Sequence, residues 1–255
     1  APPAIDTTGF TAEEVAFAAA SWTLRAEEEH RSASVFADAL AYLTDADVPL
    51  DAVGSLARTV SDELAHTELC ALLARAFGAA EPANRPLPRA AVPSDPVARR
   101  ARGLEIVAME GAVGETISSA VFLTAQRHAE EPATRTALGA ILRDEVLHAR
   151  MSWEILGVVA PTLDDAAREA LRTHVSWGLG ALEQSHMLPV LKRLERGDRF
   201  EPAWAALGVV HPEHRVNAFY GALEKRVLPS LDGLGLDGQG AWRDRYASRA
   251  PRPPV

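Results

Sequence analysis

The sequence predicts an all-α protein: a bundle of four long helices with one long crossover, followed by additional helices at the C-terminal end. Apolar residues recur at helical spacing almost throughout this Ala- and Leu-rich chain, and no stretch has the alternation of a convincing strand. A proline-rich segment separates the second and third long helices and is too long for a tight hairpin. Short, long and short connections between four helices are typical of a bundle with one crossover.

The first two helices have recognisable starts. Thr11 and Glu14 form the pattern of a capping box, which opens a helix that runs to about Thr44. Asp51 is expected to cap a second helix that reaches about Phe77. The short turn between them predicts that these two helices form an antiparallel pair.

The second pair follows the proline-rich crossover, GAAEPANRPLPRAAVPSDP. Asp95 is expected to cap the third helix, with Pro96 at its first position. Pro132 lies in the short turn before the fourth helix, which ends near Leu156.

Further helices follow. Thr162 and Asp165 open a fifth helix, and Pro189 should kink or end it. A shorter helix is expected over about 212–228, and an Arg- and Pro-rich tail completes the chain. These segments are more than a minimal bundle requires.

Length and charge bound the function. The 255 residues are enough for one large domain or two small ones, and we expect a bundle over 11–158 with a helical extension packed on it over 162–250. A net charge of −9 argues against nucleic acid or an anionic membrane surface as a partner. No apolar run approaches the roughly 20 residues that span a bilayer.

Cysteine usage indicates the compartment. The single cysteine, Cys70, excludes an intramolecular disulfide and a CxxC metal module. It suits a reducing environment, and we expect a cytoplasmic location. The chain starts at Ala1 without a charged-then-apolar leader, although a removed leader would leave no trace.

A Glu-x-x-His motif occurs twice. Glu63 and His66 lie in SDELAHTE, and Glu145 and His148 lie in RDEVLHAR. An aspartate directly precedes the glutamate in both, and each motif lies on the second helix of a predicted pair. The recurrence indicates a weak internal duplication with two-fold pseudosymmetry.

Both motifs should face the core. Residues at i and i+3 share a helix face, and the lines through both motifs consist mainly of apolar residues, such as Leu56 and Leu73 in the first and Leu138 and Ile141 in the second. An unpaired carboxylate in such a place is very costly, and a metal cation would offset that cost.

A di-metal site needs further oxygen ligands, which the first helix of each pair should supply. On the third helix Glu115 fits best, because small residues such as Gly111 and Ala112 leave room beside it. Glu110 lies about 140° round the helix from Glu115, at about 100° per residue. It is expected either to support the ligands from behind or to be a rival ligand.

The first helix offers three candidates in RAEEEHR. Glu29 lies on the most apolar line of this helix, whereas Glu28 shares its line with Arg31 and Glu27 shares its line with His30. We therefore choose Glu29. The result is one glutamate from each of two helices and a Glu-x-x-His pair from each of the other two, a known di-metal arrangement.

Two further Glu-x-x-His matches fall on less apolar lines and are interpreted as incidental. They are Glu27 with His30 and Glu183 with His186. The second pair, just before Pro189, has the alternative role of lining an entrance or supplying an extra ligand.

The ordered set of motifs resembles the ferritin-like di-iron carboxylate superfamily, and in particular bacterial ferritin-like domain proteins. Three stretches carry the resemblance over about 17–156: EEEHRSASVFA, DELAHTELC, and GETISSA followed by RDEVLHARMSW. It implies a four-helix bundle with two carboxylate-bridged iron ions, or manganese or a mixed Fe/Mn pair, that react with dioxygen or peroxide. The implied ligands are Glu29, Glu63, His66, Glu115, Glu145 and His148.

The resemblance also assigns roles around the ligands. Asp62 and Asp144 would hold the ligand histidines by hydrogen bonds across the bundle, which fixes their tautomer and orientation. The C-terminal helices depart from the minimal bundle and leave the branch of the superfamily open.

Three functions are compatible with this reading. The prediction is a non-haem di-iron oxidase or oxygenase that acts on a small organic molecule, because small residues flank Glu115 and extra helices are available to wall a pocket. The alternatives are a rubrerythrin- or ferritin-like protein that oxidises Fe(II) or removes peroxide, and a non-catalytic helical interaction module without metal. The expected partners are dioxygen or peroxide, a small substrate, an external electron donor and a second copy of the chain in a homodimer.

Overall fold

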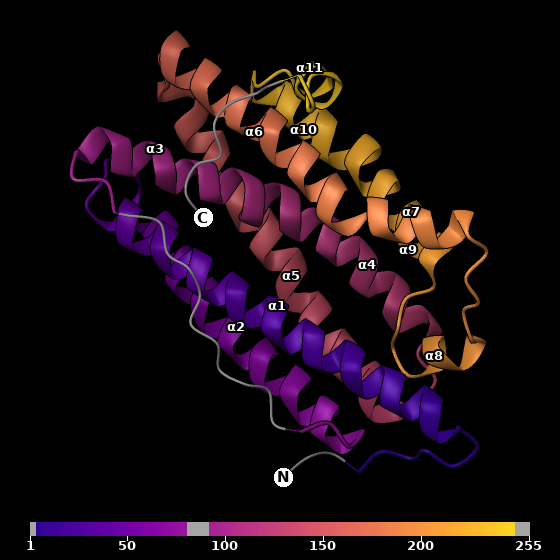
Figure 1. Ribbon diagram of the computed structural model, residues 1–255. Coiled ribbons are helices and arrows are strands. Elements are labelled where there is room, and N and C mark those ends of the chain that lie inside the picture. The colour runs from indigo at the N-terminus through magenta and orange to yellow at the C-terminus, as the bar shows by residue number, and fades with distance from the viewer. Residues whose placement is uncertain (1–3, 81–91, 248–255) are drawn as a thin grey trace.

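A computed structural model of the chain describes residues 4–80 and 92–247, and the regular structure in those two ranges is entirely helical (Figure 1). The predicted all-α class is therefore confirmed. Four long helical stretches run side by side, with α1 against α2, α2 against α5 and α4 against α5. They are α1 (Ala12–Thr44), α2 (Leu50–Ala76), the stretch Pro96–His128 and α5 (Pro132–Val159).

Two of the expected helix starts are confirmed. Thr11 closes a capping box at the start of α1, and Asp95 caps the third stretch with Pro96 in its first turn. Pro132, which was expected in the turn before the fourth helix, is instead the first residue of α5, and the Glu131 side chain caps this helix. Capping side chains accept the N–H bonds that the first turn of a helix leaves unpaired.

The expected cap of α2 is wrong. This helix begins at Leu50, and its N-cap is Pro49, which makes no side-chain cap hydrogen bond. Asp51 instead lies inside the first turn, where its negative charge interacts favourably with the positive end of the helix dipole. Most of the proline-rich crossover, 81–91, lies outside the described residues.

The fifth helix, α6 (Asp165–His186), is capped one residue earlier than expected. The Asp164 side chain accepts a hydrogen bond from a backbone N–H of the first turn, so Asp165 is helical. The helix ends before Pro189, which lies in the first turn of α7 (Leu188–Glu195). The expectation that Pro189 breaks the helix is confirmed.

The third long stretch is not a uniform α-helix. It passes from α3 (Pro96–Ile106) through a π-helical segment, η1 (Val107–Gly114), into α4 (Glu115–His128). At the junction the N–H of Glu115 donates to the carbonyl of Glu110, five residues earlier. The wider turn shifts the phase with which α4 presents its side chains, and such segments are frequent at functional sites.

This stretch is also the most apolar in the described part of the chain. It is the one helix there whose length and composition would allow it to cross a membrane, and 56% of its most apolar window is buried inside the protein. The expectation that no run is this apolar was wrong. The stretch lies against α1, α5, α6 and α9, which is the environment of a core helix.

The C-terminal part packs on the third stretch (Figure 1). There α6 contacts α3, and α9 contacts α4. One apolar core contains both Leu156 of α5 and Leu179 of α6, so the two parts share buried surface. The division into two domains stays a prediction. The remaining elements are η2 (Ala160–Thr162), α8 (Pro202–Ala206), α9 (Pro212–Ala222), η3 (Leu223–Val227), α10 (Leu228–Gly233) and α11 (Gly238–Arg243).

Candidate metal centre

The six glutamates and histidines chosen from the sequence meet in the interior between α1, α2, α4 and α5. Their ligand atoms form two overlapping groups, and within each group four atoms lie within 4.8 Å of one another. Glu63 and Glu145 belong to both groups. The exposed fractions are Glu29 6%, Glu63 1%, His66 3%, Glu115 6%, Glu145 1% and His148 0%.

The apolar line along α1 positions Glu29. Trp22 and Phe36 on that line are buried, and so is Glu29 between them. Glu28 is exposed and Glu27 is half-buried. The helix therefore directs one of its three consecutive glutamates into the core, as its sequence period requires.

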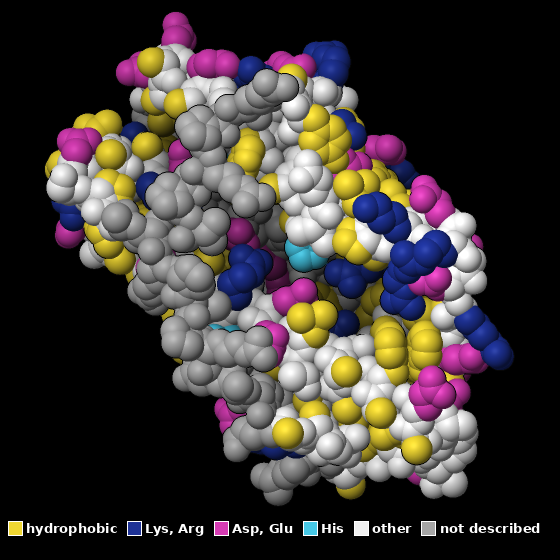
Figure 2. Space-filling model, viewed as in Figure 1, with side chains coloured by type: hydrophobic (Ala, Val, Ile, Leu, Met, Phe, Trp, Pro, Cys, Tyr) yellow, Lys and Arg dark blue, Asp and Glu magenta, His cyan; other side chains and the backbone are white. Residues whose placement is uncertain are grey.

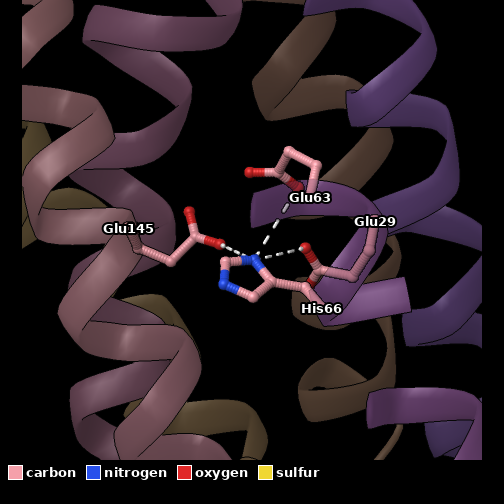
Figure 3. A group of neighbouring side chains, drawn as sticks. All are labelled: Glu29, Glu63, His66 and Glu145. Carbon is pink, nitrogen blue, oxygen red and sulfur yellow. Dashed lines mark ion pairs between the residues drawn. The ribbon is translucent and has the colours of Figure 1, made fainter. Parts of the chain in front are cut away.

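The first group is centred on His66 (Figure 3). Its Nδ1 lies 3.3 Å from Glu145 Oε1, 3.7 Å from Glu29 Oε2 and 3.9 Å from Glu63 Oε2. Carboxylates from three helices therefore converge on one edge of a single imidazole ring.

The second group is built from Glu63, Glu115, Glu145 and His148. His148 Nδ1 lies 3.1 Å from Glu63 Oε1. Glu115 is the first residue of α4, directly after η1, so the π-helical turn sets the direction of this ligand.

The small residues before Glu115 serve packing. A Cβ on Gly111 would lie 2.2 Å from Ser152 Oγ, so the glycine lets η1 approach α5 closely. The expectation that Gly111 leaves open room beside the ligand was wrong. The space that a side chain would need is filled by the opposite helix.

Two aspartates contact the histidines on the ring edge that faces away from the glutamates, and each aspartate belongs to the motif of the other histidine. His66 Nε2 lies 3.3 Å from Asp144 Oδ2, and His148 Nε2 lies 3.2 Å from Asp62 Oδ2. Arg58 lies 3.2 Å from the same oxygen of Asp62. Each motif thus supplies the aspartate that orients the histidine of the other, which is the arrangement that the resemblance implied.

The crossed contacts assign the tautomers. A carboxylate only accepts, so each Nε2 carries the proton and each Nδ1 turns its lone pair toward the glutamates. Five buried atoms here have no hydrogen-bond partner among the described residues. They are Glu63 Oε1 and Oε2, Glu145 Oε2, His66 Nδ1 and His148 Nδ1. Buried acceptors facing one another repel unless a proton or a cation lies between them.

The electrostatics show the same deficit of positive charge. Burial, reinforced by Glu145 and Glu29, raises the pKa of Glu63 to about 11. Burial also raises the pKa of Glu29 and of Glu115. Burial alone would lower the pKa of His66, but the carboxylates of Glu145 and Glu29 raise it to about 11. Without a cation, protons therefore occupy the places where metal ions would bind.

Glu110 lies outside the cluster. Its side chain is 35% exposed and its Oε2 lies 3.5 Å from Arg31 Nη2. The expected angle of about 140° from Glu115 assumed about 100° per residue. The i→i+5 bond between these two residues shows that this spacing does not hold through η1. Glu110 belongs to neither ligand group, and its carboxylate pairs with Arg31 instead.

Neither of the incidental motif matches joins the cluster. Glu183 is buried, but it accepts hydrogen bonds from the Tyr220 hydroxyl at 2.7 Å, from Arg245 Nε at 2.7 Å and from the Tyr246 hydroxyl. His30 is absent from both ligand groups. The interpretation of these matches as incidental to the ligand set agrees with the described structure.

Two arginines beside the cluster were missed. Arg25 lies one turn before Glu29, and a charged residue near an apolar line is a signal that the sequence offered. Arg215 comes from the distant α9, and no local pattern connects it with the first helix.

No protein-family model, no curated protein and no solved structure matches this chain. The resemblance to the ferritin-like superfamily stays a prediction, and the geometry of the cluster is the evidence for what the site does.

Proposed function

We propose that the cluster binds two metal ions in a ferritin-like four-helix bundle, and that the protein is a non-haem di-iron oxidase or oxygenase of a small organic molecule. One observation carries the proposal. Five buried carboxylate and imidazole atoms face one another without a hydrogen-bond partner in the described structure. Such atoms are retained in a core when a cation binds them.

The donor set fits two cations. Carboxylate oxygens and imidazole nitrogens suit iron and manganese. Glu29 and His66 belong to one group and Glu115 and His148 to the other, so each group would hold one ion, with Glu63 and Glu145 shared between them. Four carboxylates carry four negative charges, which two divalent cations would neutralise.

The aspartates and the glutamates of the cluster have different roles. Asp62 and Asp144 keep the proton on Nε2 of the histidines, so Nδ1 is free to bind a cation. The buried position of the glutamates excludes bulk water from the site. Iron bound there would supply the redox chemistry of dioxygen activation, with electrons from an external donor.

The extra helices favour an oxidase over a minimal iron-storage protein. Helices α6 and α9 pack on the third stretch and cover the bundle on the side of α4. This covering adds residues around the cluster that iron storage does not require, whereas a substrate site needs walls.

Metal content tests the proposal. We expect about two iron ions per chain after anaerobic loading with Fe(II), counted by elemental analysis. Changing Glu63 or Glu145 to Ala should remove most of the metal, because both residues belong to both groups. Glu110→Ala, on the same helical stretch as Glu115, is the matched control and should bind metal normally. Unchanged metal content in both core variants would refute the ligand assignment.

Oxygen exposure separates the functions. The reduced, loaded protein is mixed with dioxygen, with and without peroxide. Slow or substrate-gated oxidation supports the oxidase. Rapid multi-turnover conversion of Fe(II) into a mineral would show storage, and rapid consumption of peroxide would show detoxification. A protein that binds no metal at all would contradict the proposed metal centre.

A further inference from the structure

Arg25 is half-buried beside the cluster and has no counter-ion among the described residues. It lies on α1 one turn before Glu29. Its guanidinium carbon is 4.5 Å from the ring centre of Trp22 and 5.0 Å from that of Phe122. Its Nη1 is buried without a hydrogen-bond partner, and Arg25 forms no ion pair within residues 4–80 and 92–247. Aromatic faces accommodate a guanidinium but leave its N–H groups unpaired.

Arg215 approaches the same region from α9. Its Nε is buried without a partner. Burial lowers the pKa of Arg215, the charge of Arg25 lowers it further, and the exposed Glu28 opposes both. Arg25 stacks on Phe122 of α4, and α9, which carries Arg215, packs against the same helix. The two guanidinium groups therefore come from two helices that both contact α4, and Glu28 makes no ion pair with Arg215 in the described structure.

Two other partly buried arginines of this protein have acceptors for their guanidinium groups. Arg245 binds the Glu183 carboxylate, and Arg168 donates to the carbonyls of Leu234 and Ala160. The Arg25–Arg215 pair differs, because it brings two positive charges together without an acceptor. Bringing unpaired charges out of water is costly, and an anion between the two would offset the cost.

The pair lies close to the candidate metal centre. Four residues of α-helix separate Arg25 from Glu29, which is a rise of about 6 Å. Arg25 stacks on Phe122 of α4, the helix that also carries Glu115 of the cluster. Figure 2 shows a hollow on the face of the molecule that it draws, where basic, acidic and histidine side chains gather.

We propose that Arg25 and Arg215 bind the carboxylate of a small organic acid and so hold this substrate with its oxidisable end toward the metal centre. Guanidinium forks match carboxylates in a bidentate manner, whereas aromatic walls accept the body of the acid. Benzoate has both features that this site would accept, a carboxylate and an aromatic body. The inference rests on the proposed function for the oxidation, but its binding step stands without it.

Benzoate binding to the purified protein tests the inference. Isothermal titration compares the wild type with Arg25→Gln and Arg215→Gln, using benzamide as the neutral probe and inorganic phosphate as a second anion. We expect benzoate to bind at least about tenfold more weakly to either variant, because a charged hydrogen-bond partner is lost. Benzamide should bind weakly to all three proteins. Arg172→Gln, which removes an arginine paired with Glu169 elsewhere, should bind benzoate like the wild type.

Two results would overturn the inference: equal affinity of benzoate for all variants, or tighter binding of phosphate than of benzoate. Should the variants fail to fold, phenylglyoxal labelling of the wild type replaces them. Benzoate should then protect Arg25 and Arg215 from the reagent, and unchanged labelling of both would contradict the proposal.

Metal counting keeps the two proposals separate. Neither arginine is a ligand, so Arg25→Gln and Arg215→Gln should retain the metal content of the wild type. A protein that binds metal but shows no arginine-dependent benzoate binding would overturn this inference alone. A protein that binds benzoate through the arginines but takes up no metal would overturn the proposed function and leave the anion site standing.

Discussion

Two buried carboxylates in this protein, Glu183 and Glu63, are treated in opposite ways. Burial alone would raise the pKa of Glu183, but Arg245, Tyr246 and Tyr220 bind it and lower that pKa. Glu63 is as deeply buried, and both its oxygens are without a hydrogen-bond partner in the described structure. Its pKa is raised to about 11.

The difference shows where outside charge is needed. At Glu183 the chain supplies one guanidinium and two hydroxyls, so the carboxylate needs nothing further. Within the described residues, Nδ1 of both histidines lies near Glu63, but their Nε2–H groups are already used by Asp62 and Asp144. Evolution of a purely structural core would be expected to add donors there, as it did at Glu183.

Metal addition should give the largest effect. At a free metal concentration about 1,000 times Kd, binding stabilises the folded state by about 4 kcal/mol. For a chain of this size that is a rise in Tm of about 8–16 °C. The rise in Tm is measured by thermal unfolding with Fe(II) or Mn(II) and, for comparison, with a chelator. Glu183→Gln should show the same rise. An unchanged wild-type Tm would contradict the idea that Glu63, unlike Glu183, needs a cation.

Removing the charge of Glu183 should have the second-largest effect. Glu183→Gln leaves Arg245 without its carboxylate and should lower the free energy of unfolding by about 2–3 kcal/mol, somewhat less than for a fully buried pair. Urea denaturation of the metal-free protein measures this, with Glu154→Gln, at an exposed helix pair, as control. Metal content should not change; a loss of metal would show that Glu183 belongs to the site.

The effect of Glu183→Gln should depend on pH. The pKa of Glu183 is lower in the folded than in the unfolded protein. The wild-type advantage should therefore be complete above the unfolded value of about 4.3 and disappear as the pH falls through the folded value. An advantage that persists in strong acid would contradict the ion pair.

The crossed aspartates should have a smaller effect on metal than the ligands. Asp62→Asn or Asp144→Asn should weaken metal binding about 10–100-fold, because an amide no longer fixes the proton on the histidine Nε2. Competition with a chromophoric chelator measures the affinity. Asp51→Asn, in the first turn of α2, is the control. Wild-type affinity in both variants would show that the aspartates are not needed for histidine orientation.

The smallest effect is a gain in stability. Glu63→Gln should stabilise the metal-free protein by about 1–2 kcal/mol near neutral pH, since the amide needs no proton uptake. The sign follows from the raised pKa of Glu63: the wild type loses stability as the pH rises above its unfolded value of about 4.3 toward about 11. Urea unfolding at two pH values tests this, and a gain that does not grow with pH would contradict it.

The sequence was sufficient for the features that depend on regular helical period. Glu29 was separable from Glu28 because α1 keeps about 3.6 residues per turn through that region. The same assumption failed for Glu110, because nothing in the composition of η1 marks a π-helical turn, and one wide turn changes the phase of every later residue. Helical period therefore placed Glu29 correctly and failed to place Glu110, which lies within the π-helical segment.

Other features depend on partners far away in the chain. Gly111 was read as free space, but Ser152 of α5 fills it. Arg215 was not considered, because its relation to Arg25 exists only once α9 has packed against α4. A local pattern shows which side of a helix faces the core, but it cannot show which residues of other helices pack against that side.

The crossed orientation of the histidines has a consequence for ancestry. Each half of the bundle carries one acid and one imidazole for the other half, so neither half is complete on its own. Two identical helical hairpins, associated about a two-fold axis, would reproduce both contacts without any change in sequence. The present chain is thus compatible with descent from a homodimeric hairpin whose gene was duplicated and fused.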